Sequence, residues 1–376
     1  MPHPAQEAAA LKLLFGVQGT GNGHITRARA IAPVLKKLGI EADYLFSGRK
    51  KAQFFDMEPF RDYKVSNGLT FYSRKGKVQL GDTLLRNNML RLTQDVASLD
   101  VSKYDLILTD FEPVSAWAGR LAEKDVIGLG HQYAFSYNIP RIKGTVVDQF
   151  ILQNFAPADI SLGLHWHHFG APILPPIAPV EVDQYEPEHQ RILVYLPFES
   201  RSDITKLLKG FKNYHFVLYH PEAGDYQKGN LEWKAPSRQT FQQDLLRSEG
   251  VICNAGFELA SEALQLGMKF LCKPMDGQSE QQSNALALGQ LGFAGTMNTL
   301  NKDTVAQWLE LGEAVKVRYP DTAQAVGEWI QDGAREPLID LSRRLWREVV
   351  FPTTTAQFFT ATGKIPSKKG LRSHHG

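Results

Sequence analysis

Apolar residues fall along the chain in two patterns, short continuous runs and longer stretches with helical spacing. Residues 11–17 form an apolar run of strand length, and residues 25–38 repeat apolar positions at helical spacing. The turn between them, residues 19–24, contains three glycines and ends in a histidine. This pattern predicts a strand, a glycine-rich turn and a helix, with Gly39 just past the helix end.

The same alternation continues in both halves of the chain. In the first half we expect strands at residues 41–46, 106–109 and 126–129, and helices at 83–98 and 114–123. In the second half we expect strands at residues 191–196, 215–219, 251–254 and 270–273, and helices at 202–210 and from about 258. Strands that alternate with helices predict parallel, doubly wound sheets.

A proline-rich segment separates the two halves. Residues 171–179 contain four prolines, which suit neither a helix nor a central strand. We therefore expect a first Rossmann-like domain at 1–172, a linker at 173–190 and a second Rossmann-like domain at 191–352. A small, basic tail at 353–376 is expected to be disordered. The fold class is α/β, with two parallel sheets whose carboxyl ends face each other across a cleft.

Composition narrows the setting. The chain has 376 residues and a net charge of +2, which gives no reason to expect a nucleic-acid partner. Its two cysteines, Cys253 and Cys272, lie in apolar runs and read as buried thiols. We find neither a signal peptide nor a run of about 20 apolar residues, and so expect a cytoplasmic protein.

Positive charge is concentrated in residues 47–92, which carry ten basic and four acidic residues. One interpretation is a solvated face, as for most charge runs. The other is a patch for an anionic acceptor or for the inner surface of an anionic membrane, to which the protein would bind peripherally.

The glycine-rich turn is the first candidate site. It contains Gly21, Gly23 and His24, and Arg27 follows one helical turn later. The spacing fits neither the dinucleotide fingerprint nor a P-loop. A turn of this kind brings backbone N–H groups to the carboxyl edge of a sheet, which suits an anion or a polar ligand. His24 could add chemistry there; the alternative is a tight turn with a surface histidine.

The second candidate site follows the strand at 251–254. Asn254, Ala255 and Gly256 form a turn into a helix that carries Glu258 and Glu262 on one face. The helix N-terminus near Phe257 could hold a diphosphate, and a glutamate one turn later could accept hydrogen bonds from ribose hydroxyls. The alternative is an ordinary amphipathic helix with two exposed glutamates.

Together these motifs resemble the GT-B glycosyltransferases, in particular the family 28, MurG-like group. The resemblance covers both halves and rests on the following residues: Gly21-Asn22-Gly23-His24 with Arg27, Asp110-Phe111-Glu112-Pro113, His131-Gln132, Asn254-Ala255-Gly256, Glu262 and Gln281-Gln282-Ser283-Asn284-Ala285. One departure is Gln281, because the group often has a histidine before the glutamine.

The resemblance implies an inverting sugar transfer from a nucleotide sugar, with UDP favoured, and with neither a metal nor another cofactor. The first domain would bind a sugar or lipid-linked acceptor, through the cleft residues Gly21, Gly23, Arg27, His131 and Gln132. The second would bind the donor, through Asn254, Ala255, Gly256, Phe257, Glu258, Glu262, Gln281, Gln282 and Asn284.

Sugar transfer needs a base that takes the proton of the acceptor hydroxyl. His24 is the first candidate, because its ordinary pKa near 6.5 suits proton transfer at neutral pH. Asp110 and Glu112 follow a strand and should point into the cleft, either as the base or to orient His24. His131 is the third candidate.

Two other functions stay open on the same fold. One is a nucleotide-sugar hydrolase or epimerase, in which His24 would activate water. The other is a sensor that binds the nucleotide sugar without turnover.

Overall fold

The computed structural model describes residues 10–69, 73–74, 77–78, 89–142 and 154–352. The expected tail at 353–376, the first part of the expected helix at 83–98, and part of the basic stretch at 47–92 lie outside these residues.

The first half forms a sheet of six parallel strands in the order β3-β2-β1-β6-β7-β8. Its strands are β1 (Lys12–Gln18), β2 (Glu41–Ser47), β3 (Lys64–Val65), β6 (Leu106–Asp110), β7 (Asp125–Gly130) and β8 (Ile160–Gly163). Taken in chain order this is the strand order 3-2-1-4-5-6 of dinucleotide-binding folds, in which the order reverses beside the first strand. A short antiparallel pair, β4 (Ser73–Arg74) and β5 (Lys77–Val78), lies apart from the sheet.

The second half repeats this arrangement. Its sheet has the order β11-β12-β10-β9-β13-β14-β15, and only β11 at the edge is antiparallel. The strands are β9 (Glu188–Tyr195), β10 (His215–Tyr219), β11 (Tyr226–Lys228), β12 (Leu231–Lys234), β13 (Ser248–Asn254), β14 (Lys269–Lys273) and β15 (Gly295–Thr296). The expected fold class, two doubly wound parallel sheets, is therefore confirmed.

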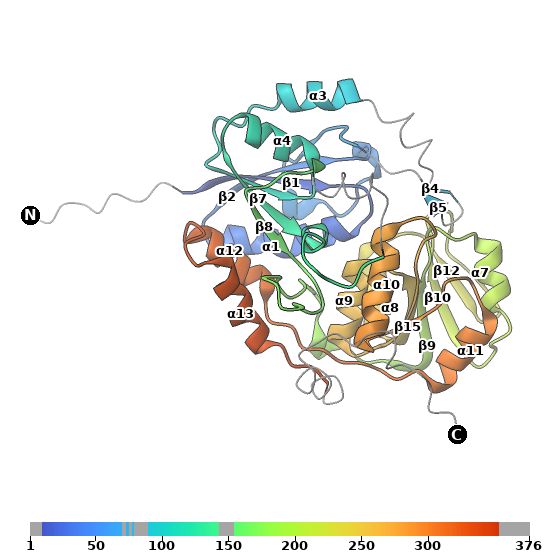
Figure 1. Ribbon diagram of the computed structural model, residues 1–376. Helices are drawn as coiled ribbons and strands as arrows, with labels where there is room; N and C mark the ends of the chain where they lie inside the picture. The colour runs from blue at the N-terminus through green and yellow to red at the C-terminus, as the bar shows by residue number, and fades with distance from the viewer. Residues whose placement is uncertain (1–9, 70–72, 75–76, 79–88, 143–153, 353–376) are drawn as a thin grey trace, which may run out of the picture.

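Helices cover both faces of the sheets (Figure 1). Those of the first half are α1 (Gly23–Lys37), α3 (Met89–Ser98), α4 (Pro113–Leu121) and α5 (His131–Ala134), with the short turns η1 (Lys51–Gln53) and η2 (Glu58–Phe60). After η3 (Val182–Gln184) come α7 (Arg201–Leu208), α8 (Arg238–Leu246), α9 (Phe257–Leu266), α10 (Ser279–Leu291), α11 (Lys302–Leu311), α12 (Thr322–Gln331) and α13 (Leu338–Glu348). The expected C-terminal end of the first helix is correct, since Gly39 follows it with a left-handed φ of +74°.

The last two helices return to the first half of the molecule (Figure 1). The α12 helix packs on α1, and Gln331 Nε2 donates a 2.7 Å hydrogen bond to the carbonyl of Leu38. The α13 helix is fastened to the linker, where Ser342 Oγ and Trp346 Nε1 both donate to the carbonyl of Ile173. Part of the expected second domain therefore packs against the first domain and the linker.

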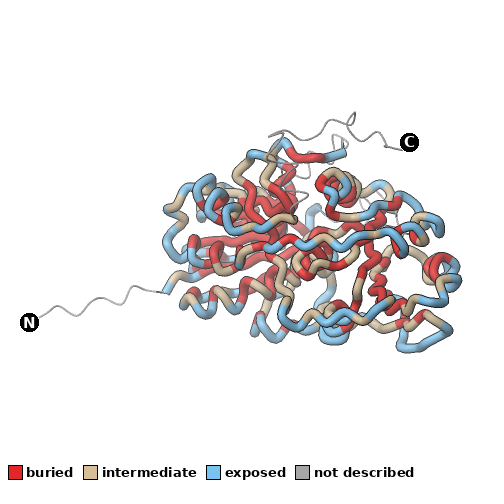
Figure 2. Tube along the Cα trace, turned by 90° about the horizontal axis from the view of Figure 1, so that it is seen from below, coloured by how far each residue is buried: buried red, intermediate tan, exposed pale blue. Residues whose placement is uncertain are grey.

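Buried residues run through both halves of the molecule (Figure 2). One hydrophobic cluster contains Phe15 of β1, Ile31 of α1, Val251 of β13 and Ala260 of α9. The helices α1 and α9, which follow the two glycine turns, thus share a core, and this holds the two candidate sites together.

Candidate functional site

The first candidate site lies at the point where the strand order of the first sheet reverses. The strands β1 and β6 are parallel neighbours, and Val17 pairs with Asp110 at their carboxyl ends. The turn after β1 leads into α1, so His24 and Arg27 lie next to the residue that ends β6. Sequence positions far apart therefore meet because parallel strands end at one edge of the sheet.

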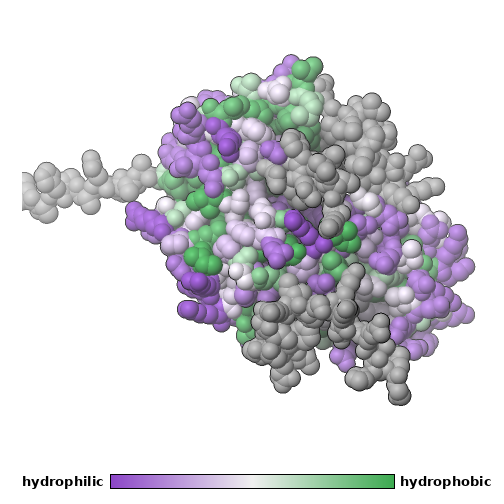
Figure 3. All heavy atoms as spheres, in the orientation of Figure 1, coloured by the Kyte–Doolittle hydropathy of each residue, from purple (hydrophilic) through white to green (hydrophobic). Residues whose placement is uncertain are grey.

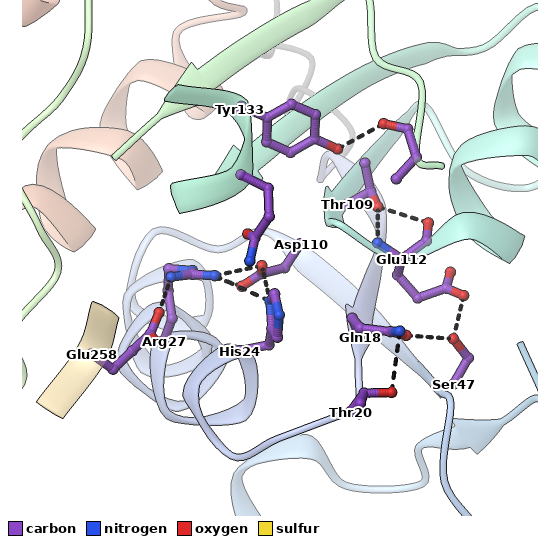
Figure 4. Close-up of polar contacts among 12 residues, drawn as sticks. Gln18, Thr20, His24, Arg27, Ser47, Thr109, Asp110, Glu112, Tyr133 and Glu258 are labelled. Atoms are coloured by element: carbon purple, nitrogen blue, oxygen red, sulfur yellow. Dashed lines mark hydrogen bonds and ion pairs between the residues drawn. The ribbon is translucent and has the colours of Figure 1, made fainter. Parts of the chain in front are cut away.

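His24, Arg27 and Asp110 form one hydrogen-bonded network (Figure 4). Asp110 Oδ1 lies 2.7 Å from His24 Nδ1, and Arg27 donates to both Asp110 oxygens, from Nε and Nη2, at 2.7 Å each. Asp110 is completely buried and Arg27 is 1% exposed, whereas the His24 side chain is 12% exposed. Only the histidine therefore reaches towards solvent.

The charges around Asp110 determine its ionisation and the direction of its hydrogen bond with His24. Burial alone would raise the pKa of Asp110, but the charge of Arg27 and the contact with His24 outweigh it, and this pKa is lowered. Asp110 is thus a carboxylate, and His24 Nδ1–H donates to it. In the described part of the chain Nε2 has no hydrogen-bond partner. A buried carboxylate thus orients the imidazole through Nδ1, and Nε2 is the nitrogen left to face a ligand.

Arg27 also connects the two halves of the molecule. Its Nη1 donates to Glu258 Oε1, at the start of α9 (Figure 4). Gly23 lies at this contact, and a β-carbon there would collide with the Glu258 carboxyl group. Gly21 is exposed and left-handed, with a φ of +88°. The glycine turn therefore allows α1 and α9 to meet end to end.

Gly130 is a part of the site that the sequence pattern did not reveal. A β-carbon at this position would lie 3.1 Å from Asp110 Oδ1 and 3.3 Å from Arg27 Nη2. No turn motif or spacing points to it, because it ends the neighbouring strand β7.

The expectation that Glu112 points into the cleft is wrong. Its carboxylate is fully buried and accepts hydrogen bonds from Val114 N at 2.8 Å and Ser115 N at 2.6 Å, which caps α4. Ser47 Oγ donates to it at 2.6 Å. Burial raises the pKa of Glu112 although these hydrogen bonds oppose the shift. Phe111, with a φ of +51°, turns the chain so that Asp110 and Glu112 point to different neighbours.

His131 and Gln132 meet residues of the second candidate site. His131 stacks on Phe257 with ring centres 4.1 Å apart, and its Nε2 lies 2.6 Å from Asn284 Oδ1. Gln132 Nε2 donates to both carboxylate oxygens of Glu280, at 3.2 and 3.3 Å. His131 is 1% exposed, so it holds the two halves together and does not open to an acceptor.

The second glycine turn has the expected form. Gly256 is the N-cap of α9, and its amide donates to the carbonyl of Asn254 at 2.7 Å. The side chain of Asn254 donates to the carbonyl of Lys273, while its Oδ1 is buried with no hydrogen-bond partner among the described residues. Ala255 is fully buried, and its carbonyl accepts from Asn284 Nδ2.

Glu262 is buried in the way a ligand-binding carboxylate would be. It is 3% exposed, and its Oε1 has no hydrogen-bond partner in the described part of the chain. Burial and the charge of Glu258 raise the pKa of Glu262 to about 8, which the nearby Gln242 amide opposes. Gln242 also lines a groove of about 530 Å³, between α8, the linker and the η2 region of the first half.

The glutamine pair at the start of α10 divides into two environments. Gln281 is buried, and its Oε1 accepts from Met275 N at 2.9 Å, so that it shapes the loop after β14. Gln282 is half-buried. The residues expected at the donor site thus lie at the start of α9 and α10, but Phe257, Gln281 and Asn284 are engaged in packing or internal hydrogen bonds.

Comparison with known proteins agrees with this architecture. A sequence profile of the family described as Glycosyl transferase family 1 matches residues 11–311. The chain therefore belongs to this family of glycosyltransferases, which is numbered differently from the family 28 of the sequence resemblance. No curated protein has a significantly similar sequence.

Solved structures with the same fold cover almost the whole chain. MurG of Acinetobacter baumannii has 14% identity and a TM-score of 0.52, covering 86% of this chain and 99% of its own. The calicheamicin glycosyltransferase CalG4 has 15% identity and a TM-score of 0.53, covering 96% and 100%. The spinosyn rhamnosyltransferase SpnG, complexed with thymidine diphosphate, has 14% identity and a TM-score of 0.53, covering 93% and 100%. The MurG-like GT-B fold is confirmed.

Proposed function

We propose that this glycosyltransferase moves a sugar from a UDP-sugar to an acceptor hydroxyl, with inversion at the sugar carbon and without a metal ion. The observation that carries the proposal is the His24–Asp110 pair, which lies across from the start of α9 and is tied to it through Arg27 and Glu258. A proton acceptor and an anion-binding helix end thus face each other from the two halves.

His24 acts as the base in this proposal. Its Nε2 takes the proton of the acceptor hydroxyl while Asp110, held ionised by Arg27, stabilises the imidazolium that forms. Asp110 itself is buried and bonded on both oxygens, so it orients the base. Direct attack of the acceptor on the face opposite the leaving diphosphate gives inversion.

The donor would bind along the start of α9. Among the described residues no side chain caps the start of this helix, so its first N–H groups and its dipole favour a diphosphate. Glu262, one turn further on, offers the ribose hydroxyls a buried oxygen that has no hydrogen-bond partner among the described residues. The hydrogen bonds that a ligand supplies there would offset the cost of burying the carboxyl group.

The acceptor would approach from the first half. Met89 is 60% exposed and Leu90 is 75% exposed at the start of α3, within the basic stretch at 47–92. Apolar side chains gather at the top of the molecule in Figure 3, where α3 lies in Figure 1. Apolar and basic residues together suit a lipid-linked or anionic acceptor at the inner face of a membrane. No helix in the described ranges is long and apolar enough to cross a bilayer.

The first experiment is a thermal-shift screen with UDP-, dTDP-, GDP- and ADP-sugars, since a ligand that binds the folded state raises its stability. The stabilising donor is then incubated with the enzyme alone and with candidate acceptors. Transfer supports the proposal. Equal release of free sugar with and without acceptors would instead identify a hydrolase, and binding without turnover a sensor.

A further inference from the structure

A buried ion pair lies at the carboxyl edge of the second sheet, outside the residues that the sequence predicts for the site. Lys273 Nζ donates to Glu199 Oε1 at 2.6 Å. The two side chains are only 5% and 11% exposed. Lys273 ends β14, and Glu199 lies in the loop between β9 and α7.

The pair spans the end of β13, the strand that leads into the second glycine turn. The strand β13 lies between β9 and β14 in the sheet, and Asn254 at its end pairs directly with Lys273. The Asn254 side chain donates to the Lys273 carbonyl, while its own Oδ1 is buried and without a partner among the described residues. The Lys273–Glu199 ion pair and Asn254 Oδ1 therefore lie beside the start of α9, where the donor diphosphate is proposed to bind.

A buried ion pair is poor evidence of stabilisation. Removing two charges from water is costly, and a pair of well-packed apolar residues often stabilises a fold equally well. Such a pair at the ligand edge of a parallel sheet suggests that one of the charges has a second partner. The lysine is the member that suits an anionic ligand.

We infer that Lys273 neutralises the nucleoside diphosphate as it leaves, and that Glu199 is its counterion while the donor is absent. The inference rests on the proposed function. In the transfer, the acceptor oxygen bonds to the anomeric carbon, and its proton goes to His24. The bond from this carbon to the diphosphate oxygen breaks, and the electron pair stays on the diphosphate, which gains one negative charge. Lys273 compensates that charge in a site of low polarity.

The test compares binding of UDP and uridine by calorimetry. The Lys273→Met variant should lose at least tenfold in UDP affinity and leave uridine affinity within twofold, because uridine carries no phosphate. The Glu199→Gln variant should bind UDP several-fold more tightly, since Lys273 then lacks a competing carboxylate. If the thermal-shift screen selects a donor with another nucleobase, the corresponding nucleoside and nucleoside diphosphate replace uridine and UDP in this test.

Two further variants separate this role from a structural one. Lys269→Met removes a lysine from the opposite end of β14, whose Nζ lies 3.4 Å from the Leu309 carbonyl, and should leave both affinities unchanged. The double variant Lys273→Met/Glu199→Gln avoids an unpaired buried carboxylate and should keep the fold while losing UDP affinity.

An unchanged ratio of UDP to uridine affinity in the folded double variant would overturn the inference and leave the proposed function intact. A wild-type protein that binds no nucleoside diphosphate would instead refute the proposed function itself.

Discussion

The Glu262 carboxyl group is buried, one of its oxygens has no partner in the described part of the chain, and its pKa is raised to about 8. Burial therefore favours the protonated form of Glu262 near neutral pH. Ribose hydroxyls that donate to Glu262 would stabilise the ionised form and lower this pKa. We expect UDP binding to release a proton at pH 7.5, measured by calorimetry in buffers with different ionisation enthalpies.

The Glu262→Gln variant is the control, because it keeps the shape and removes the titrating group. It should bind UDP without that proton release, and Glu262→Ala should bind about 1.5–3 kcal/mol more weakly. Proton release that persists in Glu262→Gln would mean that the proton comes from another group.

His24 gives the second residue-scale prediction. His24→Ala should keep UDP affinity and thermal stability but lose roughly 10²–10⁴ in turnover, the usual contribution of a general base. Asp110→Asn should also slow turnover, because the amide orients the imidazole differently. A His24→Ala enzyme with nearly normal turnover would rule out the histidine as the base.

Residue patterns predicted part of this site. His24 and Arg27 follow the glycine turn after β1, and Asp110 ends β6. Because these two strands are parallel neighbours, the three residues are expected to meet. The burial of Glu112 did not follow, because it depends on the left-handed backbone at Phe111 and on a helix cap. The Lys273–Glu199 pair was not predicted, because no spacing in the sequence indicates that two residues 74 positions apart meet across the end of β13.

At the scale of elements, the α1 helix carries two buried arginines with different partners. Arg27 binds Asp110 and Glu258, whereas Arg29 donates to the carbonyls of Phe55 and Asp56. Lysine keeps the charge but cannot reproduce the planar fork of Arg27. Arg27→Lys should therefore lower turnover at least tenfold, measured at saturating donor.

Arg29→Lys is the matched control. It should lower the melting temperature through the loop at Phe55–Asp56 and leave turnover within about twofold. Equal loss of turnover in both variants would mean that the arginines act only through the stability of α1.

The strands and helices of the two glycine-turn motifs were predicted well, whereas the helices α8, α11, α12 and α13 were not predicted. The helix α1 continues through Pro33 to Lys37. The proline removes one backbone hydrogen bond, and the burial of Ile31 and Leu35 offsets that loss. The edge strand β11, its neighbour β12 and the four-residue strand β8 were not predicted, since short segments carry little periodicity.

At the scale of the molecule, α12 joins the end of the chain to the first half. Nothing in the sequence pattern indicates this return, because a helix that packs on a distant helix has the same periodicity as one that packs nearby. Gly327 of α12 faces α1 so closely that a β-carbon would lie 2.5 Å from Val34 Cγ1 and 3.0 Å from Leu38 Cδ1. The packing of α12 on α1 therefore depends on the absence of a side chain at position 327.

This close approach gives the last prediction. Gly327→Ala should destabilise the protein by about 1–3 kcal/mol and lower its melting temperature, because overpacking outweighs the better helix propensity of alanine. Gly289→Ala in α10 is the control, since the nearest atom to its β-carbon would be Thr296 Cγ2 at an ordinary 3.7 Å. There the same exchange should be neutral or stabilise by up to about 1 kcal/mol. Equal melting temperatures for the two variants would show that α12 does not fix the first half in solution.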